Sequence, residues 1–407
     1  MTPAFRSLVL AAGLTYASVF GFARFAYSVM LPAMRDDFGA TVATMGMLAS
    51  SNLMGYVLGS GLAMLLTARF RTDRVSLAGL VSVCAGLLLL AVTPGPGGAL
   101  VLMFVLGVGS ALAFIATTAM VSNAVPERRG RLLGFATAGI GLGTTGCSLV
   151  IAFLLEIGDD GWRWSWFALG VLLTAAVPWI HRTVSSADRE RVASSGAANT
   201  DDKPTWGAVA RHRRLWVFPM YVCWGAGYIV YVMFVTAFLH DERGLSVGTA
   251  ALIYSVIGVA AIFGGPLVGP LSDRLTRPPL MALTMATCAG GTALLVVADT
   301  VGLYLVSAVL FGMPISAIGT LIAAYVGDLW RPIEQGPIFA GVTLLFGIAQ
   351  AVTPAVVGIV TDRVGTLTPA FLFAVAILLL GAVISLVLPG RSEPPVREAK
   401  GHEPCSI

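Results

Sequence analysis

The sequence has few charged residues: Asp, Glu, Lys and Arg make up 11% of its 407 residues, whereas hydrophobic residues make up 57%. A soluble domain carries about 25% charged residues, so this chain could not cover a water-exposed surface. The scarcity of charge excludes a soluble enzyme, a disordered protein and a nucleic-acid-binding protein. The formal net charge of +4 is also too small to indicate a polyanionic partner. We therefore expect an integral membrane protein surrounded by the lipid bilayer.

Residues that form disulfides, metal sites and catalytic sites are also scarce, with five cysteines and four histidines. No cysteine lies in a loop expected outside the membrane, so the sequence does not indicate a disulfide framework. It contains no Cys-x-x-Cys pair, no Cys/His cluster and no Walker loop. The histidines lie outside the middle of the apolar runs, so no Ser/His/Asp triad can be assembled. We expect no metal, no cofactor and no enzymatic activity.

Long apolar runs, by contrast, are abundant, and a membrane helix needs about 20 such residues. The runs in the first half cover roughly 8–31, 42–67, 75–93, 99–122, 132–156 and 164–181. Those in the second half cover roughly 215–239, 249–271, 280–298, 302–327, 337–360 and 369–389. The period-two alternation of a membrane barrel is absent. The sequence predicts an all-α membrane protein with twelve transmembrane helices in two six-helix halves.

Polar stretches divide the chain into four parts. The predicted parts are an N-terminal half (1–182), a linker (183–214), a C-terminal half (215–390) and a tail (391–407). With the N-terminus inside, twenty Lys and Arg side chains fall on the cytoplasmic side and four outside, and Arg24 remains within a span. Cytoplasmic loops are rich in Lys and Arg. We therefore expect a multi-pass protein of the cytoplasmic membrane with both termini and the linker cytoplasmic.

Six plus six spans around a cytoplasmic linker is the layout of a two-half secondary transporter. After the eighth span the segment from Gly269 to Arg277 reads GPLSDRLTR. This segment resembles the Gly-x-Leu-Ala-Asp-Arg-x-Gly-Arg loop of the major facilitator superfamily. Ala68 occupies the Asp position in the matching first-half loop. The resemblance covers nearly the whole chain and implies the major facilitator fold.

The resemblance also implies gating residues. In the superfamily, the second-half loop lies against the first turn of the fifth span. Asp273 would then be a latch, attracted by the helix N-terminus and by neighbouring basic residues. The predicted gating residues are Asp273, Arg274, Arg277, Arg129 and Arg131.

A closer resemblance lies near the N-terminus. Residues 21–34 read GFARFAYSVMLPAM and residues 49–56 read ASSNLMGY. Both segments resemble the YbfB/YjiJ-type branch of the superfamily, which implies transport without specifying a substrate.

Arg24 is the one charge deep within a span, about seven residues from the outer end predicted for it. An ionisable residue in the membrane costs about 2.5–3.5 kcal/mol at a helix centre and is a functional hypothesis by default. No Asp, Glu or His lies mid-span to pair with it. A guanidinium can bind a carboxylate, phosphonate or sulfonate through two hydrogen bonds. We predict that Arg24 binds an organic anion; the alternative is a structural arginine bonded to neighbouring helices.

Other polar and aromatic side chains fall at helical spacing around Arg24 or on the seventh span. They could stack on the body of a ligand and bond its polar end, or they could pack helices together. The predicted substrate-binding residues are Arg24, Phe20, Tyr27, Asn52, Tyr56, Trp224, Tyr228, Tyr231 and Gln350.

These observations predict a monomeric secondary active transporter of a small organic solute, working by alternating access, with an organic anion as the favoured substrate. A proton is a candidate coupling ion. Two alternatives remain open. One is efflux of uncharged or amphipathic drug-like compounds, for which the aromatic lining would dominate. The other is a non-transporting membrane receptor or scaffold on the same fold.

Overall fold

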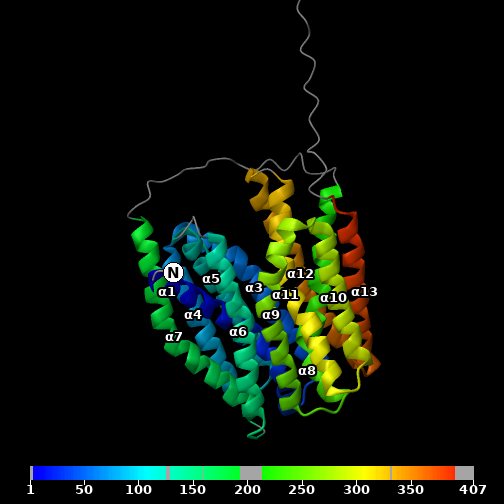
Figure 1. Cartoon of the computed structure of the whole chain (residues 1–407). Helices are drawn as coiled ribbons and strands as arrows, with labels where there is room; N and C mark the ends of the chain where they lie inside the picture. Colours follow the sequence, from blue (N-terminus) through cyan, green and yellow to red (C-terminus); the bar gives the residue numbers. More distant parts are fainter. Residues whose placement is uncertain (1–2, 125–128, 159, 193–212, 331, 390–407) are drawn as a thin grey trace, which may run out of the picture.

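The computed structural model describes residues 3–124, 129–158, 160–192, 213–330 and 332–389, and within them all regular elements are helical. Twelve helical spans in these residues are long and apolar enough to cross a membrane. The predicted all-α architecture is therefore confirmed. Figure 1 shows the helices of the two halves as two groups side by side, blue to green and green to red.

The first half has a composite first span made of α1 (Pro3–Tyr16), η1 (Ala17–Phe25) and α2 (Ala26–Phe38). Its other spans are α3 (Val42–Arg69), α4 (Thr72–Ala91), α5 (Pro96–Ala124), α6 (Arg129–Leu155) and α7 (Gly161–Val192). Helix α7 includes residues 183–192, which the sequence assigned to the linker.

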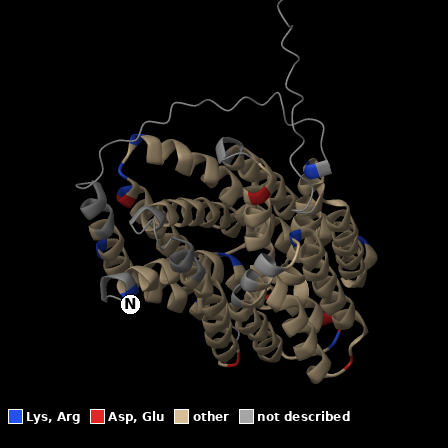
Figure 2. Ribbon diagram, turned by 45° about the horizontal axis from the view of Figure 1, so that its top comes forward, with Lys and Arg blue, Asp and Glu red and all other residues tan. Residues whose placement is uncertain are grey.

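The second half begins with a short 3₁₀ turn, η4 (Arg213–Trp216). Its spans are α8 (Val217–Asp241), α9 (Val247–Arg274), α10 (Arg277–Val297), α11 (Val301–Leu329), α12 (Pro332–Val364) and α13 (Thr368–Val387). We call the end of the bundle where α7 ends and η4 begins the linker side, and the opposite end the far side. Most of the ribbon in Figure 2 is uncharged, with Lys, Arg, Asp and Glu mainly at helix ends and connections.

The same turn follows the first span of each half. Gly39 and Gly244 have φ of 57° and 67°, a left-handed conformation that glycine adopts at little cost. Two residues later, the side chains of Thr41 and Ser246 accept hydrogen bonds from the backbone N–H of Thr44 and Thr249 and cap the next helix. The sequences GATVAT and GLSVGT thus mark an internal repeat that the motif analysis missed.

The first span is longer than predicted and is not a uniform α-helix. It continues past Leu31 to Phe38, so Arg24 lies about 20 Å from the far end at about 1.5 Å per residue. Around Arg24 the helix widens into the π-helical η1, where the Ala26 N–H donates to the Gly21 carbonyl. Such widened turns are rare and occur frequently at functional sites. The longer helix places Arg24 farther from the far end of its span than the sequence indicated.

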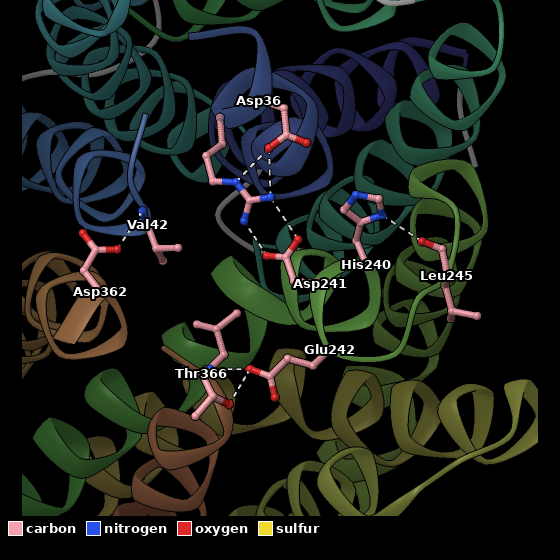
Figure 3. A network of polar contacts seen from close by, with 10 residues as sticks. Asp36, Val42, His240, Asp241, Glu242, Leu245, Asp362 and Thr366 are labelled. Carbon is pink, nitrogen blue, oxygen red and sulfur yellow. Dashed lines mark hydrogen bonds and ion pairs between the residues drawn. The ribbon is translucent and has the colours of Figure 1, made fainter. Parts of the chain in front are cut away.

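The halves are joined most strongly on the far side. Arg35 on α2 donates to Asp241 at the end of α8, with 2.9 Å between Nη2 and Oδ1 (Figure 3). The Asp362 carboxylate on α12 accepts from the backbone N–H of Val42 at 3.0 Å, as Figure 3 shows. It also accepts from the backbone N–H of Ala43 at 3.1 Å. A carboxylate is favourable there because it faces the positive end of the α3 dipole.

Deeper in the bundle, α2 and α8 bond to each other directly. Ser28 donates to the carbonyls of Val232 and Met233, and Thr236 donates back to the Ser28 carbonyl. Gly46 on α3 allows a close approach to α12, because an added Cβ would collide with the Pro354 carbonyl oxygen. Among the described residues, the hydrogen bonds and ion pairs between the halves lie from the middle of the bundle to the far side. The structure is therefore a far-side-closed conformation.

Candidate substrate-binding site

Arg24 is buried where the two halves meet, with 6% of its surface exposed. Its Cζ atom lies 4.4 Å from the ring centroid of Tyr56 and 5.1 Å from that of Phe20. Nη2 is buried without a hydrogen-bond partner. None of the ion pairs within the described residues includes Arg24. Two aromatic faces thus compensate its charge in part, and no carboxylate in the described part of the chain neutralises it.

Asn52 fixes the helical segment that carries Arg24. Its Nδ2 donates to the carbonyls of Ala23 at 3.2 Å and Met103 at 3.1 Å, so its amide joins η1, α3 and α5. Gly21, three residues before Arg24, packs so closely on α6 that an added Cβ would lie 2.5 Å from the Gly143 carbonyl carbon. Asn52 therefore holds the guanidinium's helix in place, and its N–H groups are already used.

The second half contributes a ladder of nearly parallel rings on α8 and α12. Tyr221 stacks on Phe346 with centroids 4.5 Å apart and planes at 14°. Phe346 and Tyr228 are 5.8 Å apart at 11°, and Tyr228 and Trp224 are 5.3 Å apart at 7°. Offset stacks of this kind suit a flat apolar ligand body as well as one another.

Tyr228 connects this ladder to the polar part of the cluster. Its hydroxyl donates to Oε1 of the buried Gln350 at 2.7 Å. Both Tyr228 and Tyr56 lie close enough to Arg24 to interact with it electrostatically. The structure thus brings together Arg24, Phe20 and Tyr56 from the first half with Tyr228, Trp224 and Gln350 from the second. We call these six residues the central cluster.

Two residues predicted to bind substrate have other partners. The Tyr27 hydroxyl donates to the Met45 carbonyl at 2.7 Å. Tyr231 stacks on Phe311 at 3.8 Å, and its hydroxyl bonds to Ser307 at 2.7 Å. Both side chains are fully buried in helix packing. Helical spacing predicted that Tyr27 lies on the same face as Arg24 and that Tyr231 lies on the same face as Tyr228. Because the helix widens at η1 and α8 is almost completely buried, Tyr27 and Tyr231 contact neighbouring helices instead.

Of the predicted gating residues, only Arg277 has a described side chain. It forms an ion pair with Asp328, which joins α10 to α11 within the second half. The structure does not describe the side chains of the four residues predicted to act with it: Asp273, Arg274, Arg129 and Arg131. Their role as a latch stays a prediction.

Phe346 is a member of the ring ladder that the sequence analysis missed. It precedes Gln350 by four residues, the spacing that puts two side chains on one helix face. That spacing on the eleventh span was the signal that could have found it. No group of three or more metal-ligating side chains exists among the described residues.

An apolar groove of about 630 Å³ lies apart from the central cluster. It is lined by residues of α6, of α7 and of their connection: Leu154, Ile157, Trp164, Phe167, Ala168, Val171, Leu172 and Ala175. None of them is a predicted site residue, and the lining has no charged group to bind a polar solute.

We expect Tyr228→Phe to weaken binding of an anionic ligand more than Tyr231→Phe does. Each change removes one hydroxyl and leaves its buried partner, Gln350 or Ser307, without that bond, so each should lower stability by about 0.5–1.5 kcal/mol. Only the Tyr228 hydroxyl lies beside Arg24. Thermal unfolding and ligand titration of both variants would check this. Equal losses of affinity would show that Tyr228 acts only through packing.

The fold is that of a twelve-span membrane protein, with the central cluster buried between its two six-helix halves. The sequence matches the family model described as Major Facilitator Superfamily over residues 14–329 and again over 247–405. The chain belongs to this superfamily, whose proteins are transporters of small solutes and not enzymes.

Individual relatives are distant. The chain is 24% identical to the probable sulfoacetate transporter SauU of Cupriavidus necator, over 89% of this chain and 88% of that protein. It is 24% identical to the hexuronate transporter of Bacillus subtilis, over 93% of each. The crystal structure of a D-xylose–proton symporter superposes with a TM-score of 0.76 at 16% identity, over 95% of this chain and 98% of that one. This last likeness shows the fold alone.

Proposed function

We propose that this protein carries a small organic anion across the cytoplasmic membrane by alternating access, with Arg24 as the principal contact. The observation that carries the proposal is the buried Arg24 guanidinium, which has an unbonded Nη2 and no carboxylate partner among the described residues. A buried charge is costly unless it is paired and hydrogen-bonded. A carboxylate or sulfonate would supply both the opposite charge and the acceptors.

The relatives support the same substrate class. Sulfoacetate and hexuronates, named for the two similar transporters, are organic anions at neutral pH. The ring ladder from Tyr221 to Trp224 adds a flat apolar surface next to the charge. We therefore favour anions with a carboxylate or sulfonate group and a compact body. The branch suggested by residues 21–34, the monomeric state and proton coupling stay predictions.

A thermal-shift screen on the purified protein tests the proposal. The panel pairs each anion with a neutral counterpart: sulfoacetate with acetamide, glucuronate with glucose, and benzoate with benzamide. Cationic drugs form a third group. We expect stabilisation by one or more anions and none by their neutral counterparts. Stabilisation by neutral or cationic amphiphiles alone would contradict the proposal.

Efflux of uncharged or amphipathic compounds is the second candidate function. The observation in its favour is the ladder of four aromatic rings, which would bind an apolar molecule without help from Arg24. In that case Trp224 and Tyr228 are the main contacts. The neutral members of the panel distinguish the two functions.

We further propose that the linker side faces the cytoplasm, since twenty of the 25 basic residues fall there. In a Cys405→Ser background, Ser186→Cys on the linker side should resist a membrane-impermeant thiol reagent added to intact cells. Thr300→Cys, at the far-side start of α11, should react with it. The four cysteines within the described spans are buried and should not react with the reagent. Labelling of Ser186→Cys from outside would reverse the topology.

A further inference from the structure

We propose that the carrier is an obligatory anion exchanger: it changes conformation readily only with an anion bound, so one anion leaves as another enters. This inference rests on the proposed function and adds the mode of coupling. It follows from the positive charge of Arg24, which the other residues of the central cluster do not compensate when no ligand is bound.

Arg24 differs from three of the arginines near the helix ends. Arg35, Arg163 and Arg277 each form an ion pair with an aspartate. Among the described residues, Arg24 has the faces of Phe20 and Tyr56 and the neighbouring hydroxyl of Tyr228, and no carboxylate. The Tyr228 hydroxyl already donates to Gln350, and the Asn52 amide already donates to two carbonyls. The groups around Arg24 in the described part of the chain therefore leave its charge uncancelled.

Alternating access requires this charge to pass through a state closed on both sides. Water can solvate the guanidinium while one side is open, but closing the second side removes that water. An uncompensated charge in such a site is costly, whereas a bound carboxylate cancels it. The free-energy barrier to passing through the state closed on both sides should thus be higher for the carrier without an anion than for the carrier with an anion bound.

A proton is poorly placed to replace the anion as the coupling partner. Within the described residues, no Asp, Glu or His forms a hydrogen bond or an ion pair with the central cluster, and carboxylates such as Asp241, Asp362 and Asp328 lie near the helix ends. Protonation near the site could not cancel a positive charge in any case, because it adds charge of the same sign. A second anion would cancel the charge of Arg24 during the return step, so the counter-substrate is an anion.

The test follows conformational exchange without needing the native substrate. Donor and acceptor dyes are attached to Gly97→Cys, in the first turn of α5, and Thr300→Cys, just before α11, in the Cys405→Ser background. Both positions lie on the far side, one in each half. Single-molecule energy transfer then reports the opening and closing of the far side. We compare the protein that has Arg24 with the Arg24→Gln variant. Each is measured without ligand and then with saturating glucuronate or sulfoacetate.

We expect the ligand-free protein to interconvert slowly and to accelerate about ten- to a hundred-fold with anion. Without any ligand, Arg24→Gln should interconvert as fast as the wild type does with anion, because it has no positive charge in the central cluster that must pass through the closed state. Tyr231→Phe, which alters a hydroxyl outside the central cluster, is the matched control and should behave as wild type.

If Arg24→Gln fails to fold, Tyr56→Glu provides the second variant, since it places a carboxylate beside the guanidinium. It too should accelerate the empty carrier. Empty-carrier rates in Arg24→Gln or Tyr56→Glu equal to wild type would overturn the exchange proposal, even if Arg24→Gln had lost anion binding and the proposed function stood. If the wild-type rate did not respond to either anion although both bound, exchange would also be overturned.

Discussion

Arg24→Gln should reduce the affinity for a carboxylate ligand about ten- to a hundred-fold. A charge-assisted bidentate pair shielded from water contributes about 1.5–3 kcal/mol, and about 1.4 kcal/mol corresponds to a factor of ten. Gln keeps polarity, but it is shorter and loses both the charge and the planar fork. Arg24→Lys keeps the charge and loses the fork, so its affinity should lie between wild type and Arg24→Gln.

The comparison that isolates the charge uses matched ligands. Titration calorimetry with an anion and its neutral counterpart, benzoate and benzamide for example, should show that Arg24→Gln affects only the anion. A fully folded Arg24→Gln protein that binds and transports its substrate as wild type does would make Arg24 a structural residue. Efflux with Trp224 and Tyr228 as main contacts would then become the favoured function.

Gly46→Ala should open the far side. The added methyl would collide with the Pro354 carbonyl oxygen, and both groups are held on long helices that cannot give way locally. Overpacking of this kind costs about 1–3 kcal/mol, which corresponds to about a five- to hundred-fold shift in the conformational equilibrium. The collision exists only while α3 and α12 are in contact, so the far-side-open conformation escapes it.

Gly61→Ala is the matched control for this change. Gly61 lies on the same helix, α3, and an added Cβ there meets no atom within 4 Å. Both substitutions gain the same helix propensity, so their difference measures the collision. The readout is the rate at which Ser50→Cys, at the α3–α12 contact, reacts with a thiol reagent from the far side. Equal rates in the two alanine variants would show that Gly46 does not control far-side closure.

The sequence predicted the class of the protein because that depends on composition and length. Twelve apolar runs of membrane-spanning length require helices, since the bilayer offers no partner for a free backbone N–H or C=O. Arg24 was recognised by the same rule, as a charge too deep in an apolar run to reach water. These inferences needed no knowledge of which helices are neighbours.

The partners of each side chain could not be read in this way. Helical spacing put Tyr27 with Arg24 and Tyr231 with Tyr228, but both tyrosines bond to groups on other helices. Spacing gives the face of a helix and says nothing about what packs on that face. The π-helical turn at η1 also shifts the faces of one span, and its pattern of hydrogen bonds has no signature in the sequence.

By itself, the sequence determined that this protein is embedded in a membrane through twelve helices, and it singled out one buried arginine. The tertiary structure decided that Arg24 meets Tyr56 and Tyr228 from opposite halves. It also decided that Asn52 supports the helix and that the halves close on the far side through Arg35, Asp241 and Asp362. The reason is physical: burial depends on the residues along one helix, whereas compensation of a buried charge depends on contacts between residues far apart in the chain.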